Sequence, residues 1–167
     1  FPEEGIKYLV LSGETVRRYG PEDGFYGKNG GGAFGAIAEN SDTPFVFVDD
    51  MPFCGAGETK NPSSAKKLTI DLNGHTLTAD MTDWKTPGGY NYIFRIQGAN
   101  TETHIYSSKP GAVINAGPVA VAMLNWTGDL YIGGSSYAGN LTLVTDSTVV
   151  RHNASGNVTV TGTAINA

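Results

Sequence analysis

Cysteine is almost missing from this chain of 167 residues, which has one, Cys54. A single thiol excludes a disulfide within the chain and any zinc site built from several cysteines. A catalytic thiol needs a histidine base close to it in space, and the sequence does not show such a pair. We therefore expect Cys54 to be a small, partly buried side chain.

Charge is also scarce. Charged residues make up 16% of the chain, and the net charge is −5 with a pI near 5.0. A nucleic-acid-binding groove needs a stripe of lysine and arginine to neutralise phosphates. The densest basic segments are two residues long, Arg17–Arg18 and Lys66–Lys67. The composition therefore argues against nucleic acid as a partner.

Long apolar segments and long runs of helix-forming residues are lacking too. No window approaches 18 uninterrupted apolar residues, so we expect no insertion into a membrane. Pro2, Glu3 and Glu4 do not begin a signal peptide, and we interpret the chain as a mature or excised secreted domain. The 23 glycines suit many short strands joined by tight turns.

What the sequence does contain is a repeat. Asn125–Gly134 (NWTGDLYIGG) aligns with Asn153–Gly162 (NASGNVTVTG), and Asn100–Ser108 aligns with the first of these when Ile105 is placed on Leu130. The segment KKLTIDLNGHTLTAD joins the same alignment when Leu68 is placed on Ile105. The period is about 25 to 28 residues, within the range of stacked repeats.

Four segments align in this way, and each is a strand, a glycine-containing corner and usually a second strand. They are Leu68–Ala79, Ile105–Ala116, Leu130–Leu143 and Val158–Ala167. The pattern predicts an all-β fold, a parallel β-solenoid in which Asn73–Gly74 is a corner and not a hairpin turn. A β-sandwich of short strands is the alternative.

The first part of the chain differs from the repeats. Ile6–Gly20 indicates two strands around Ser12–Gly13, Ala33–Glu39 is a short helix candidate, and Phe45–Val48 is an apolar strand. We therefore divide the chain into strands and a capping segment at 1–50 and coils at 51–167. The chain stops on a repeat unit at Ala167, so we expect an exposed sheet edge there, which indicates either a piece of a longer protein or an end that pairs with another partner.

The segment LTIDLNGHTLTAD (Leu68–Asp80), preceded by AFGAIAEN and TPFVFVDDM, resembles the start of right-handed parallel β-helix proteins of the pectate-lyase-like superfamily. The resemblance is greatest to uncharacterised bacterial cell-surface members and covers residues 31–167. It implies a right-handed parallel β-helix whose N-terminal cap contains a short helix. It also implies an extracellular protein that handles polysaccharides as a lyase, a hydrolase or a binding module.

The catalytic motifs of that superfamily are incomplete here. The hydrolases carry Asn-Thr-Asp, Asp-Asp, Gly-His-Gly and Arg-Ile-Lys, whereas this chain has only Asp49–Asp50, Gly74–His75 and Arg95–Ile96 as fragments. No column of acids forms around Asp71 in the alignment. We name no catalytic residue, and we expect His75 to pack or hydrogen-bond at its corner and His104 to be a surface or turn residue.

Aromatic residues suggest a binding surface. If Ile105 and Leu130 point inward, Tyr106 and Tyr131 point outward in one column with Thr69 and Thr159. Further carbohydrate-binding candidates come from the loop 81–92 and from a turn; they are Trp84, Tyr90, Tyr92 and Trp126. The alternative is that the stacked tyrosines only stabilise the sheet.

Calcium is the one cofactor that the sequence raises. Asp80 and Asp83 flank the loop and are weak candidates for calcium ligands, with solvated loop acids as the alternative.

These observations predict a secreted or cell-surface module that is adhesive or binds a polysaccharide or cell-surface glycan without catalysis. A polysaccharide lyase or glycoside hydrolase of the same superfamily is one alternative. Another is a structural subunit of a surface fibre or phage spike, associating end to end or with a larger protein through the C-terminal coil.

Overall fold

The computed structural model describes part of the chain: residues 8–12, 15–19, 45–47, 50–53, 57–58, 66–79, 92–96, 101–117, 119, 121–125, 127–152 and 155–166. The expected helix Ala33–Glu39, Cys54 and most of the loop 81–92 lie outside these residues.

The described residues are mostly strands, with one 3₁₀ turn, η2 (Ser135–Tyr137). The strands are β1 (Tyr8–Ser12), β2 (Thr15–Tyr19), β3 (Phe45–Phe47), β4 (Met51–Phe53), β5 (Gly57–Glu58), β6 (Lys66–Asp71), β7 (Thr76–Ala79), β8 (Tyr92–Ile96), β9 (Thr101–Tyr106), β10 (Ala112–Gly117), β11 (Val121–Asn125), β12 (Asp129–Gly133), β13 (Leu141–Thr145), β14 (Thr148–His152), β15 (Val158–Thr161) and β16 (Thr163–Asn166). The expected all-β class is therefore confirmed for this part of the chain.

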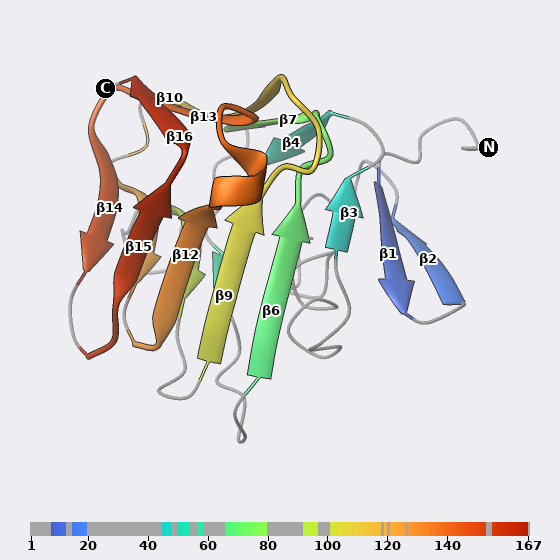
Figure 1. Cartoon of the computed structure of the whole chain (residues 1–167), viewed down its shortest axis with the longest axis horizontal. Helices are drawn as coiled ribbons and strands as arrows, with labels where there is room; N and C mark the ends of the chain where they lie inside the picture. The colour runs from blue at the N-terminus through green and yellow to red at the C-terminus, as the bar shows by residue number, and fades with distance from the viewer. Residues whose placement is uncertain are drawn as a thin grey trace.

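The strands form three sheets. Sheet A has the order β15-β12-β9-β6-β3-β1-β2, sheet B has β16-β13-β10-β7-β4, and sheet C has β14-β11-β8-β5 (Figure 1). From β3 onward the chain visits A, B and C in rotation, and each return to a sheet adds the next strand beside the previous one. We call each set of three consecutive strands a round. All pairings between rounds are parallel, and none of these sheets closes on itself within the described residues.

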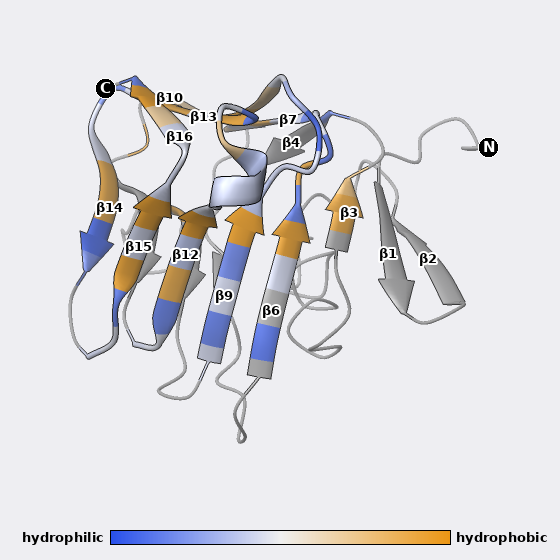
Figure 2. Cartoon of the chain, viewed as in Figure 1, coloured by the Kyte–Doolittle hydropathy of each residue, from blue (hydrophilic) through white to orange (hydrophobic). Residues whose placement is uncertain are grey.

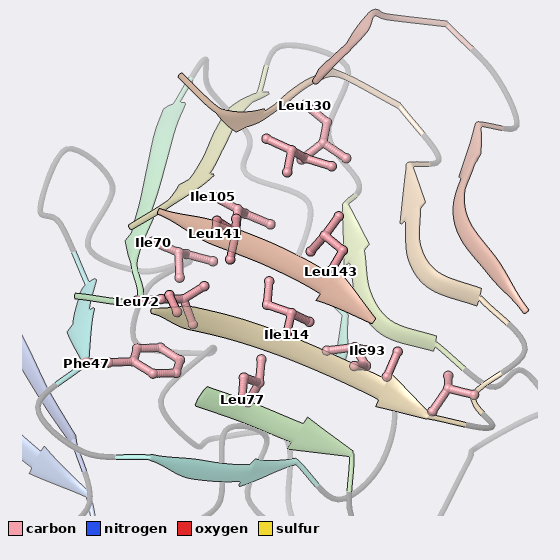
Figure 3. Packing of buried hydrophobic residues seen from close by; sticks show 14 residues of the cluster. Phe47, Ile70, Leu72, Leu77, Ile93, Ile105, Ile114, Leu130, Leu141 and Leu143 are labelled. Atoms are coloured by element: carbon pink, nitrogen blue, oxygen red, sulfur yellow. The ribbon is translucent and has the colours of Figure 1, made fainter. Parts of the chain in front are cut away.

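The strands alternate buried residues, most of them apolar, with residues on the outward face. In β9 and β10 every second residue is buried, because successive side chains of a strand point to opposite faces. Figure 2 shows residues of different hydropathy alternating along β9 and β12. The buried faces of the strands together line one apolar core (Figure 3).

Two rows of inward residues run across the sheets. In sheet A, Ile70 is opposite Ile105, which is opposite Ile132, which is opposite Val160. In sheet B the row is Leu77, Ile114, Leu143 and Ile165. The first three residues of each row are at most 1% exposed, whereas Val160 and Ile165 in the last strands are 41% and 47% exposed.

The corner at Asn73–Gly74 is confirmed. Both residues have positive φ, 48° and 84°, and His75 N–H donates to Leu72 C=O at 2.8 Å. This turn geometry also suits a two-residue hairpin. Here it joins β6 in sheet A to β7 in sheet B, so the chain changes sheets instead of reversing.

Part of the sequence alignment was wrong in register. Ile105 is opposite Ile132 and not Leu130, and Leu68 is opposite Thr103 and not Ile105. Both errors are slips of two residues. Such a slip leaves the same residues pointing inward, so the hydrophobic pattern cannot detect it. The alignments of Leu77 with Ile114 and of Leu130 with Val158 are confirmed.

The N-terminal strands are as expected. β1 and β2 pair antiparallel around Ser12–Thr15, and β3 begins at Phe45 as predicted. β3 is antiparallel to β1 and parallel to β6, so it joins the hairpin to the parallel part of sheet A. The division at residue 50 stays a prediction. The described residues contain no helix long and apolar enough to cross a membrane.

Candidate functional site

A hollow of about 320 Å³ lies on the face of sheet A that points away from the core. Two strands and the segment after β12 form it. It is lined by Lys67, Thr69, His104, Tyr106, Gly133, Gly134, Ser135, Ser136 and Tyr137. Figure 1 shows η2 in front of the arrowheads of β9 and β12, at this place.

One stack of rings stands between β9 and β12 beside the hollow. His104 and Tyr131 are opposite each other in the sheet, with ring centroids 4.6 Å apart and planes 9° apart. This spacing is close to the distance between neighbouring strands, so the two rings stand upright and parallel. His104 lines the hollow, whereas Tyr131 lies behind it.

Glu102 connects the two basic residues of the hollow. Its Oε1 is hydrogen-bonded to His104 Nε2, and the same oxygen lies 3.8 Å from Lys67 Nζ. The Lys67 and Glu102 side chains are about half exposed, at 55% and 45%. An exposed ion pair of this kind adds little stability, but it holds the lysine and the imidazole at the edge of the hollow.

A second stack lies at the C-terminal end of β9. Tyr106 stacks on Tyr137 of η2, with ring centroids 4.6 Å apart and planes 17° apart. When the register is continued one step beyond the pair Ile105–Ile132, the residue opposite Tyr106 is Gly133, which has no side chain. The Tyr137 ring occupies this place above the sheet. Partial burial raises the pKa of the Tyr106 phenol, and the nearby Asp71 carboxylate and Tyr137 add to this effect.

The segment Gly133–Asn140, which we call the η2 loop, is held by the next round. Gly133 has φ +76°, and a Cβ there would lie 2.1 Å from Thr161 O and 2.3 Å from Thr163 Oγ1. Gly134 N–H donates to Thr161 C=O at 3.0 Å, and Gly139 N–H donates to Gly162 C=O at 2.8 Å. The loop is thus anchored at both ends by backbone hydrogen bonds.

The predicted tyrosine column is corrected by the register. Tyr131 is opposite His104, and Tyr106 is opposite Asp71 on the other side, so the column through Tyr131 is Thr69, His104, Tyr131 and Thr159. Both tyrosines do lie half-exposed on the outward face of sheet A. They belong to different stacks, and the single column predicted from the sequence was a result of the two-residue slip in the alignment.

The other candidates are not part of this hollow or are not described. Tyr92 begins β8 in sheet C, a different sheet from Tyr106 and Tyr131. The remaining aromatic and acidic candidates lie outside the described residues; they are Trp84, Tyr90, Trp126, Asp80 and Asp83. Their roles in carbohydrate or calcium binding stay predictions.

Sequence reasoning missed His104 and Tyr137 as site residues. His104, which was expected at the surface or in a turn, lies within β9 on the outward face of sheet A and is half-buried. Its outward position could be read from the alternation with Thr103 and Ile105. Tyr137 sits in the segment GGSSYAG between two strands, a glycine-rich loop of the kind that carries binding residues.

His75 lies at its corner as expected. Its Nδ1 is 3.5 Å from Asp50 Oδ1, and that carboxylate also accepts the Thr76 N–H at 2.8 Å. Among the described residues, no three of His, Cys, Asp and Glu are grouped to hold a metal ion. The described residues that line the hollow offer hydroxyls, backbone groups, one lysine, one imidazole and aromatic rings.

The chain matches no protein-family model, no curated protein and no solved structure. The resemblance to pectate-lyase-like proteins therefore stays a prediction drawn from the residues alone.

Proposed function

We propose that this chain is a secreted or cell-surface carbohydrate-binding module, wound as a right-handed parallel β-helix, that holds a saccharide without cleaving it. The observation that carries the proposal is the hollow on sheet A, where aromatic rings, hydroxyls and a lysine meet on one outward face. The partner that fits is a polysaccharide or a cell-surface glycan.

The order of the strands supports the β-helix. Consecutive strands enter sheets A, B and C in rotation, and each round lies beside the previous one in parallel. A β-sandwich is instead built of antiparallel sheets. In a β-helix the outward faces of the rounds form long exposed surfaces, on which side chains from successive rounds combine into one site.

The chemistry of the hollow supports a saccharide ligand. A sugar ring has an apolar face of C–H groups and an edge of hydroxyls, so it suits an aromatic ring beside hydrogen-bonding groups. Tyr106 and His104 supply the rings, and Thr69, Ser135 and Ser136 supply hydroxyls. The neutral form of the Tyr106 phenol, favoured by its raised pKa, both donates and accepts hydrogen bonds.

The alternative is that the two stacks only stabilise sheet A. Each stack uses one face of each of its rings. His104 and Tyr106 line the hollow in addition to stacking. Support for a binding role therefore comes from the open hollow and not from the stacks alone.

The test is a glycan-array screen of the purified chain, with and without calcium, followed by analysis of the glycan after binding. We expect binding that leaves the glycan intact and that falls at least tenfold in Tyr106→Ala, since an aromatic hot-spot residue is worth about 2 kcal/mol or more and about 1.4 kcal/mol is tenfold in affinity. Thr142→Ala on sheet B is the matched control, because Thr142 is half-buried and points outward away from the hollow. A calcium requirement would support a role for Asp80 and Asp83.

Two outcomes would contradict this proposal. Shortened or unsaturated sugar products would favour the lyase or hydrolase alternative. Equal binding by Tyr106→Ala and wild type would remove the hollow as the site.

A structural subunit is the second candidate, and one observation favours it. Val160 and Ile165 continue two apolar inward rows, yet they are 41% and 47% exposed. An exposed, apolar sheet edge is a surface on which another chain can pair.

A further inference from the structure

The hollow has a boundary on the side of β12. His104 lines it, but Tyr131, stacked on the far face of His104, does not. The hollow therefore ends at the His104 ring in this direction. Tyr106 and Tyr137 form the second stack on the same side, because Tyr137 lies above the end of β12.

The hollow has another boundary at the C-terminal ends of the strands. Tyr106 is the last residue of β9, and the η2 loop leaves β12 there and contributes five consecutive lining residues, Gly133–Tyr137. The backbone hydrogen bonds to Thr161 and Gly162 hold this loop in place. At the opposite end of the hollow the lining residue is Lys67, whose side chain is 55% exposed.

These two boundaries meet at Tyr106. A saccharide chain that ran along the strands would meet the η2 loop, and one that ran across sheet A would meet the His104–Tyr131 stack. The volume of about 320 Å³ is also at the lower end of the usual range for ligand pockets, about 300–1,000 Å³. This space suits about one or two sugar rings and not a long segment of polysaccharide.

Resting on the proposed saccharide-binding function, we infer that the hollow binds the end of a saccharide chain and not its middle. The terminal ring lies against Tyr106 beneath the η2 loop, where its terminal hydroxyl meets Ser135 and Ser136. The rest of the saccharide leaves past Lys67. Tyr137 determines this selectivity by packing on Tyr106, and it acts as a positioning residue for the terminal ring.

The experiment compares how the protein binds to the ends and to the internal units of the glycan that the array screen identifies. Calorimetry measures the affinity and the stoichiometry for short oligomers, for the long polymer, and for oligomers whose terminal hydroxyls are methylated at one end or the other. We expect the same affinity per chain end for short oligomers and polymer, with one protein bound per end. Methylation of the recognised end is expected to weaken binding about tenfold, as for one lost hydrogen bond.

Two variants at Tyr137 test whether the η2 loop determines the preference for chain ends. Tyr137→Ala is expected to reduce the preference for chain ends, whereas Tyr137→Phe keeps the stack and the preference. Thr142→Ala is the control on another sheet. If Tyr137→Ala does not fold, the comparison of oligomers with wild-type protein still decides the question.

Binding that grows stronger with oligomer length, with several proteins per polymer and no effect of methylation, would overturn this inference while leaving the proposed function intact. Binding to no glycan at all would overturn both.

Discussion

At the residue scale, Asp71 joins two rounds through one carboxylate. It is 6% exposed, and its Oδ1 accepts the Asn73 N–H at 2.8 Å and the Ser108 N–H at 2.9 Å. Ser107 makes a second connection between the same two rounds, since its hydroxyl accepts the Gly74 N–H at 2.9 Å. A buried carboxylate is stable here because backbone donors from both rounds solvate it.

Replacing this carboxylate gives the first prediction. Asp71→Ala leaves two backbone N–H groups without their acceptor and is expected to lower the free energy of unfolding by about 3 kcal/mol. Asp71→Asn keeps an acceptor oxygen and is the matched control, with a smaller loss. Urea unfolding measures both, through a change in the midpoint at constant m value. Equal stabilities for the two variants and wild type would show that Asp71 does not join the rounds.

The second prediction concerns the Tyr106 phenol, whose pKa is raised above 10.0, first by burial and then by the Asp71 and Tyr137 groups. A raised pKa in the folded state stabilises the fold fully below pH 10.0, and this contribution is lost as the pH rises through the folded-state pKa. Tyr106→Phe removes the contribution, so the decline of stability at alkaline pH should become shallower. Asp71→Asn should lower the pKa of Tyr106, because it removes a nearby negative charge.

Absorbance titration of the phenol, in wild type and in both variants, measures this. Tyr106→Phe should remove one tyrosine from the part of the titration above pH 10.0. An unchanged alkaline titration in all three proteins would contradict the assignment.

At the scale of elements, the sequence was informative about strands and corners and uninformative about some registers. The alternation in the segment Lys66–Asp80 and the Asn73–Gly74 break correctly predict β6, β7 and the corner between them. The same alternation does not distinguish Ile105 opposite Leu130 from Ile105 opposite Ile132, because a slip of two residues keeps every side chain on its face. The Tyr106–Tyr137 stack was unpredictable for a different reason. It depends on a loop folding back over the sheet, which no local pattern encodes.

The third prediction concerns Gly133, the first residue of the η2 loop. Gly133 and Gly139 both have positive φ, at 76° and 81°, but only Gly133 has atoms where a Cβ would lie. Gly139→Ala is expected to cost about 1 kcal/mol, the strain of a left-handed conformation. Gly133→Ala should cost about 1–3 kcal/mol more, because Thr161 O and Thr163 Oγ1 must move.

Thermal unfolding of the two variants measures this difference in stability. Their affinity for the glycan identified on the array is measured as well. Since the η2 loop lines the hollow, Gly133→Ala is expected to weaken binding more than Gly139→Ala. Equal melting temperatures would indicate that β15 and β16 move aside without cost.

At the scale of the whole molecule, the rounds bury one another, and within the described residues the last strand of each sheet has a neighbouring strand on one side only. β14, β15 and β16 each stand at the end of their sheet order. β15 and β16 carry no charged side chain, whereas sheet edges that avoid pairing usually carry lysine or proline. Within the described residues, the inward apolar rows of sheets A and B thus continue to an edge that nothing covers.

The last prediction follows from this edge. If it pairs with another chain, the purified protein associates as its concentration rises, and Ile165→Asp prevents the association by placing a charge in an apolar interface. Ala164→Asp is the matched control, because it adds the same charge to the same strand on the outward face, opposite Thr142 of β13. Light scattering over a range of concentrations measures the mass of all three proteins. A wild-type chain that stays monomeric throughout would remove the structural-subunit candidate, whereas equal association by Ile165→Asp would place the contact elsewhere. Glycan binding measured on the same samples then tells whether saccharide recognition belongs to the single chain or to the assembly.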